Sequence, residues 1–147
     1  MTPVRRSVAF LAMLAVLFPV LAVSRACAQT RLSDKDLEQR IKNMNSDIKQ
    51  FRSMFNSSVS KSSIRKTTQE KEGKALVEQF QQASNSLYQT FKKTRKSDPY
   101  LQNCLNLSTQ IDRLLQSTQF DSATVSEWTK IKPQLNDIAT AFHVPGY

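Results

Sequence analysis

The stretch LEQRIKNMNSDIKQFRSMF, residues 37–55, decides the fold. Its apolar side chains recur at alternating spacings of four and three residues, and polar residues fill nearly every position between them. This heptad pattern is typical of a helix that buries one stripe against its neighbours. Ser33 is a suitable N-cap, so we predict a helix over about 34–59. The stripe consists of Leu37, Ile41, Met44, Ile48, Phe51 and Phe55.

Three further apolar stripes follow, each behind a helix start signal. Thr67 and Glu70 form a capping box, and Asp98 precedes a proline that suits the first position of a helix. We predict helices over about 68–95, 99–118 and 122–143. Their stripes are Leu76, Phe80, Ala83, Leu87 and Phe91; Leu101, Cys104, Ile111 and Leu115; and Val125, Trp128, Ile131, Leu135, Ile138 and Phe142.

Four amphipathic helices joined by short polar segments bury their stripes most simply in an all-α, up-down-up-down antiparallel four-helix bundle. Two residues disagree locally with this pattern. Pro133 removes a backbone hydrogen bond from the last helix and clashes with the carbonyl four residues before it, so we expect a kink near Thr129. Gly73 costs its helix up to ~1 kcal/mol relative to alanine, and nothing in the sequence explains its presence.

The composition excludes several classes of protein. The chain has 147 residues and only two glycines, whereas an all-β fold needs glycine at many of its turns. Its two cysteines cannot build a disulfide framework, and no C-x-x-C pair exists. The 21 Lys and Arg outnumber the 12 Asp and Glu. One small basic domain fits these numbers.

Residues 1–28 have the pattern of a cleaved signal peptide. They contain no acid, carry Arg5 and Arg6, and then run apolar from residue 8 to residue 23. Cleavage before Gln29 leaves residues 29–147 as the bundle domain, exported to a periplasm or secreted. An alternative is a lipoprotein anchored through Cys27. We expect no transmembrane helix once the signal is removed, because no later segment is long and apolar enough.

The sequence contains none of the common catalytic motifs. Glu-x-x-His pairs for a metal, HExxH, nucleotide-binding glycine loops and G-x-S-x-G are all missing from the sequence. The one histidine, His143, has Thr140 three residues before it rather than an acid. We therefore expect no catalytic residues, no metal and no cofactor. Cys104 lies on an apolar stripe and is expected to be a buried hydrophobe; the alternative is an intermolecular disulfide in an oxidising compartment.

Met44 and His143 allow one cofactor hypothesis. A methionine in the first helix and a histidine late in the last one resemble the cytochrome b562 type, in which such a pair holds a b-type haem. The resemblance covers the architecture and these two residues. In the helical count His143 follows the stripe residue Phe142 by one, which directs it to the flank. The simpler interpretation is that Met44 fills the core and His143 is a solvated residue favourable to the helix dipole.

A basic cluster is the other candidate site. It consists of Lys92, Lys93, Arg95 and Lys96, at the end of the second predicted helix. It suggests a module that binds anionic polymers or membrane surfaces. Cations in a last helical turn also satisfy the helix dipole without any partner. No specific nucleic-acid motif accompanies the cluster, because the aromatic residues lie on the buried stripes.

The C-terminal stretch WTKIKPQLNDIATAFHV resembles a group of uncharacterised exported bacterial helical-bundle proteins. The likeness is carried by Trp128, Ile131, Leu135, Ile138, Ala139 and Phe142, while Pro133 departs from the pattern of that group. The resemblance implies a helical bundle and export, and it implies no activity. The sequence thus favours a non-enzymatic structural or interaction module of the cell envelope or secreted space, with a haem-binding electron carrier and an anion-binding basic module as alternatives. The sequence does not identify the partner, which is either a protein or an anionic polymer.

Overall fold

The computed structural model describes residues 32–96, 98–143 and 146. The predicted signal segment, with Cys27, lies outside these residues. The described chain forms four helices and no strand, so the predicted all-α fold is confirmed, and each predicted helix boundary lies within two residues of the observed one. The helices are α1 (Asp34–Val59), α2 (Thr68–Thr94), α3 (Asp98–Ser117) and α4 (Ser122–Ala141).

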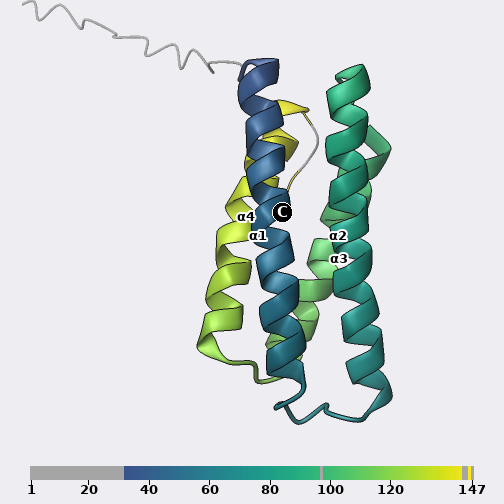
Figure 1. The fold of residues 1–147 in the computed structure, drawn as a ribbon, viewed down its shortest axis with the longest axis vertical. Helices are drawn as coiled ribbons and strands as arrows, with labels where there is room; N and C mark the ends of the chain where they lie inside the picture. The colour runs from purple at the N-terminus through teal and green to yellow at the C-terminus, as the bar shows by residue number, and fades with distance from the viewer. Residues whose placement is uncertain (1–31, 97, 144–145, 147) are drawn as a thin grey trace, which may run out of the picture.

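The helices alternate in direction as an up-down-up-down bundle (Figure 1). α1 packs against α2 and α4, and α2 also packs against α3, whereas α3 and α4 are the least closely packed neighbours. Three short connections, 60–67, 95–97 and 118–121, join successive helices. Among the described helices, none combines the length and the apolar character needed to cross a membrane.

The predicted stripe of α1 is the spine of the core. Leu37 is 5% exposed and the other five residues of the stripe are completely buried. Trp128 of α4 sits at the centre of the bundle, where its ring centroid lies 5.1 Å from that of Phe51 and 5.5 Å from that of Phe80. One polar contact interrupts the apolar core between α1 and α2: the buried Ser84 hydroxyl donates a hydrogen bond to the Asn45 side-chain carbonyl.

One predicted stripe position is wrong, and three others, Leu76, Leu115 and Phe142, are only partly buried. Val125 is 40% exposed, and Thr124 takes its place in the core. The strict alternation of four and three, counted back from Trp128, leads to position 124, so hydrophobicity misplaced the stripe by one residue. In α2 the stripe is displaced in the same way, because Val77 is completely buried while Leu76 is only partly so.

Three helices end one or two residues earlier than predicted, and α4 is continuous through the proline at which a kink was expected. α2 ends at Thr94, α3 at Ser117 and α4 at Ala141. Arg95, directly after α2, and His143, two residues after α4, take left-handed φ angles of 57°. This conformation terminates a helix and exposes its last carbonyls to caps. α4 runs unbroken through Pro133. Proline has no N–H, so the helix lacks one backbone hydrogen bond at this position.

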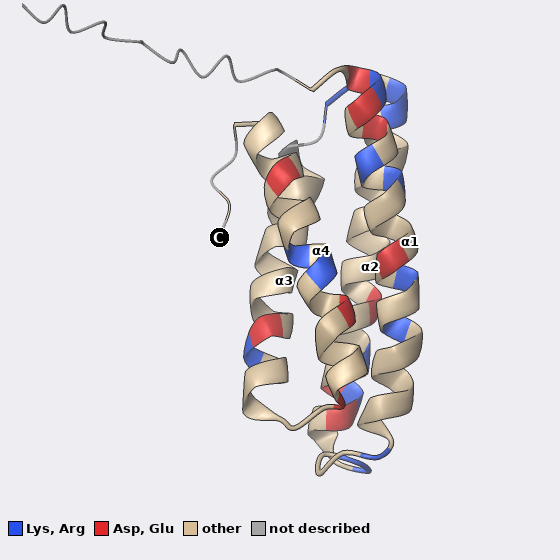
Figure 2. Cartoon of the chain, turned by 90° about the vertical axis from the view of Figure 1, so that its left-hand side faces the viewer, with Lys and Arg blue, Asp and Glu red and all other residues tan. Residues whose placement is uncertain are grey.

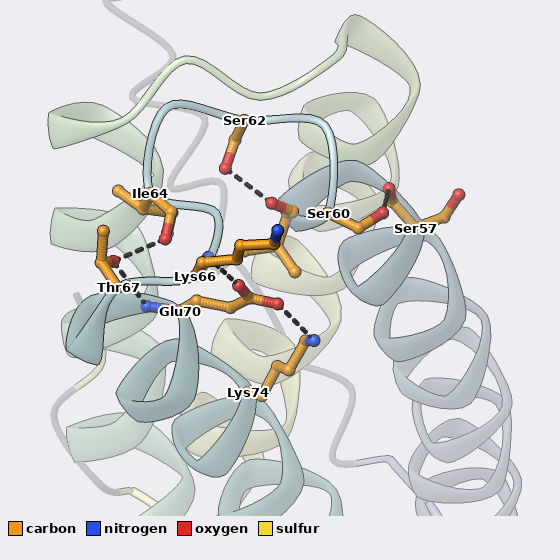
Figure 3. A network of polar contacts seen from close by, with 9 residues as sticks. Ser57, Ser60, Ser62, Ile64, Lys66, Thr67, Glu70 and Lys74 are labelled. Atoms are coloured by element: carbon orange, nitrogen blue, oxygen red, sulfur yellow. Dashed lines mark hydrogen bonds and ion pairs between the residues drawn. The ribbon is translucent and has the colours of Figure 1, made fainter.

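The connection between α1 and α2 is a hydrogen-bonded turn (Figure 3). The Thr67 hydroxyl accepts from the Glu70 backbone N–H at 3.3 Å, as the capping box predicts. The Glu70 carboxylate accepts from Lys74 at 2.6 Å and from the Lys66 backbone N–H, rather than from Thr67. Both hydrogen bonds lower the pKa of the Glu70 carboxyl, and the bond to Lys74 has the larger effect. The serine-rich sequence is therefore ordered by local bonds that start α2.

Gly73 has a packing role that the sequence did not reveal. It is buried, and a Cβ atom there would lie 3.0 Å from Leu114 Cδ2 of α3 and 3.2 Å from Phe55 Cζ of α1. The missing side chain therefore lets three helices meet near the connected end of α1 and α2. This close approach offsets the helix propensity that glycine lacks.

We expect Gly73→Leu to lower the free energy of unfolding by about 1–3 kcal/mol, because the added side chain overfills this contact. The control Lys71→Leu, at an exposed position of the same helix, is expected to change it by less than about 0.5 kcal/mol. Urea unfolding followed by circular dichroism measures both. Equal effects would show that the contact is not tight.

Candidate interaction surface

The α2–α3 hairpin carries two long segments without a single charge. Residues 79–91 of α2 and 99–111 of α3 contain no Lys, Arg, Asp or Glu. The two helices pack closely against each other, so the segments lie side by side. In Figure 2, α3 is free of charged residues over most of its length. The hairpin therefore presents one long surface whose middle is uncharged, and we call it the α2–α3 face.

A groove runs along this face between the two helices. It consists of two hollows of about 630 and 300 Å³ that share Gln79 as a lining residue. The larger lies toward the start of α2 and the smaller toward its middle. Amide side chains line much of the groove: Gln69, Gln79, Gln82, Asn103 and Gln110.

Apolar groups are also open to solvent on the α2–α3 face. Tyr100 at the start of α3 is 38% exposed, and Leu76 and Leu114 are only partly buried along the groove. Side chains that combine an apolar body with hydrogen-bonding capacity, and a low density of charge, are typical of the centre of a protein–protein interface. The α2–α3 face has both properties.

The opposite side of the bundle, made by α1 and α4, differs in chemistry. There, charged and amide side chains of α1 bond to those of α4. Arg40 Nη1 lies 2.6 Å from Asp137 Oδ2, and Gln134 Nε2 donates to Asp47 Oδ2 at 2.6 Å. Such partly exposed pairs contribute little stability, but they make this side well hydrated. A partner that covered it would have to remove that water.

The predicted basic cluster lies at one end of the bundle. Lys92, Lys93, Arg95 and Lys96 are all exposed. The Arg95 side chain already has partners within the same chain. Its Nη1 lies 2.6 Å from Glu38 Oε2, and its guanidinium lies 5.3 Å from the centre of the Phe91 ring. Figure 2 shows acidic residues at the start of α1 among the basic ones at this end. The cluster is therefore of mixed charge.

The structure does not bring the two haem-ligand candidates together. Met44 is completely buried in the middle of α1. His143 is exposed beyond the end of α4, and it lines an open hollow of about 790 Å³ with Arg40, Phe91 and Phe142 among others. Met44 is not part of that lining. Among the described residues, no group of His, Cys, Asp or Glu is arranged to hold a metal ion.

Cys104 is completely buried in the core, as its place on the stripe predicts. Burial raises the pKa of its thiol to about 12, so the thiol stays protonated at neutral pH. A protonated, inaccessible thiol is a poor nucleophile and a poor disulfide former. An intermolecular disulfide through Cys104 would therefore require the core to open.

Comparison with known protein families, with characterised proteins and with solved structures finds no match. The candidate surface is consequently defined by its own chemistry.

The sequence analysis did not find the α2–α3 face, although a signal was present. Both charge-free segments are visible in the sequence, in a chain that is 22% charged. The predicted sites were drawn from clusters of charged residues and not from the segments that lack them. Only the packing of α2 on α3 shows that the two segments form one surface.

Proposed function

We propose that this protein is an exported, non-enzymatic interaction module that binds the uncharged polar surface of another polypeptide through its α2–α3 face. The observation that carries the proposal is the uncharged middle of that face, where residues 79–91 and 99–111 lie side by side along the smaller hollow. Burying a charge without a partner is costly, whereas amides and hydroxyls can exchange water for hydrogen bonds on a partner. The uncharged middle of this face is therefore the part of this basic chain that costs least to cover.

Export is part of the same proposal. The basic and apolar pattern of residues 1–28 supports a signal peptide, and the resemblance of the last helix to exported bacterial bundles agrees with it. The two alternative functions receive less support. Met44 and His143 lie apart, and Glu38 of α1 already pairs with Arg95 in the basic cluster.

Site-specific photocrosslinking in the source cell tests the proposal. A photoreactive residue is placed at Gln82 or Asn103, both exposed in the groove, and as a control at Lys49, exposed on α1. We expect one discrete adduct from both groove positions and none from Lys49. The added substitution Gln79→Arg should abolish that adduct, because it puts a charge where the two hollows meet. Adducts from Lys49 alone, or adducts that survive Gln79→Arg, would contradict the proposal.

A further inference from the structure

The α2–α3 face carries two charges at one end of its groove, and they have opposite signs. Glu72 of α2 and Arg113 of α3 both line the larger hollow and are both exposed. Within the described chain, neither makes an ion pair or a hydrogen bond, although most other acidic side chains have a cationic or capping partner. Gly73 and Leu114, the next residues along the chain, approach each other closely. An unpaired acid and an unpaired base thus lie at nearly the same level on opposite sides of the groove.

We infer that the partner of this face is a second copy of the same chain, related to the first by a two-fold axis parallel to the helices. The inference rests on the proposed function and names its partner. A rotation about such an axis places α2 of each copy opposite α3 of the other without changing the height along the bundle. Each Glu72 then faces the Arg113 of the second copy, and the contact occurs twice.

The other end of the groove is complementary in shape under the same rotation. Tyr100 of α3 is exposed beside a hollow whose α2 side is formed by the small residues Ala83 and Ser86. All three line one hollow, so the rotation brings this hollow of one copy against the same hollow of the other. Tyr100 of each copy then lies on the α2 side of the other copy, which Ala83 and Ser86 form. A two-fold axis perpendicular to the helices would instead set the Glu72 and Arg113 end against this uncharged end and leave both charges unpaired.

The size of the face is compatible with a specific contact. α3 has 20 residues. Two adjacent helices of that length cover about 30 by 20 Å, or roughly 600 Å² per copy. Stable interfaces bury about 800 Å² per partner, so this dimer interface belongs at the small end of the size range.

Charge reversal tests the inference. Glu72→Arg and Arg113→Glu each place like charges opposite one another at both symmetric contacts, so each variant alone is expected to dimerise at least about tenfold more weakly. An equimolar mixture of the two variants should restore dimerisation. In that mixed dimer, one copy contributes two arginines and the other two glutamates, so both contacts are attractive. An ion pair within one chain would give no such restoration on mixing.

Sedimentation equilibrium of protein purified after expression of the full chain measures the association. Lys42→Glu, an exposed charge reversal on α1, is the control and should leave dimerisation unchanged. Circular dichroism confirms that each variant is folded. A wild-type protein that is monomeric at about 100 μM, where even weak association is detectable, variants that dimerise normally, or a mixture that does not recover would each overturn the inference. If the photocrosslinked adduct has another mass than twice the chain, the inference fails while the proposed function stands; no adduct from the groove defeats both.

Discussion

Trp128→Ala is expected to lower the free energy of unfolding by about 3–5 kcal/mol, a large share of the 5–15 kcal/mol typical of a domain. Trp128 belongs to α4, and its side chain contacts all three other helices. The ring packs on Phe51 of α1 and Phe80 of α2, and the indole N–H donates to Asp112 Oδ1 of α3 at 2.7 Å. α3 and α4 are the least closely packed neighbours. The hydrogen bond from Trp128 to Asp112 therefore links the two helices that share the fewest other contacts.

Trp128→Phe separates the two contributions of this side chain. Phenylalanine retains most of the packing but has no N–H, and Asp112 keeps its ion pair with Lys132 at 2.7 Å. We expect a loss of about 1–2 kcal/mol, from the hydrogen bond and the smaller ring. Urea unfolding followed by circular dichroism suits both variants, because they lack the only tryptophan of the chain. Equal losses for alanine and phenylalanine would contradict the packing role.

Phe80→Ala has the second large expected effect, also about 3–5 kcal/mol. Phe80 is completely buried and stands edge-on to Trp128, at an interplanar angle of 68°. Removing its ring leaves a cavity between α2 and α4 that the surrounding helices can close only in part. The same urea titration measures the loss.

Lys92→Ala, exposed in the last turn of α2, is the matched control for Phe80 and should change stability by less than about 0.5 kcal/mol. Because Phe80 and Trp128 touch, the double variant should lose less than the sum of the two single losses. Similar costs at Phe80 and Lys92 would refute the assignment of faces in α2.

The helices could be predicted because their stripes and caps agree. In α1 every predicted stripe residue is buried, and Ser33 caps the helix by accepting from the Asp36 backbone N–H. Errors arose where hydrophobicity and position disagree. Val125 is apolar but lies off the stripe, and Thr124 is polar but lies on it. A position on the inner side of a helix is buried whatever its polarity, which composition alone does not reveal.

The candidate surface was less predictable than the fold, since it depends on which helices are neighbours. The cluster from Lys92 to Lys96 drew attention as a run along the chain, yet Arg95 turned out to be held by Glu38, 57 positions earlier in the sequence. The role of Gly73 likewise depends on Leu114 and Phe55, which come from other helices. Contacts between distant parts of the chain leave no local pattern from which to predict them.

The hydrogen bond between Ser84 and Asn45 bears on how this chain selects one alignment of its helices. A heptad repeat permits α2 to slip along α1 by seven residues, about 10 Å, with apolar side chains still facing each other. Such a slip would bring Asn45 opposite Val77 or Phe91, neither of which has a side chain that can bond to it. A buried amide without a partner costs about 1–3 kcal/mol. This polar pair, which an apolar pair could replace with little loss of stability, thus penalises the shifted bundles and keeps the population of molecules uniform.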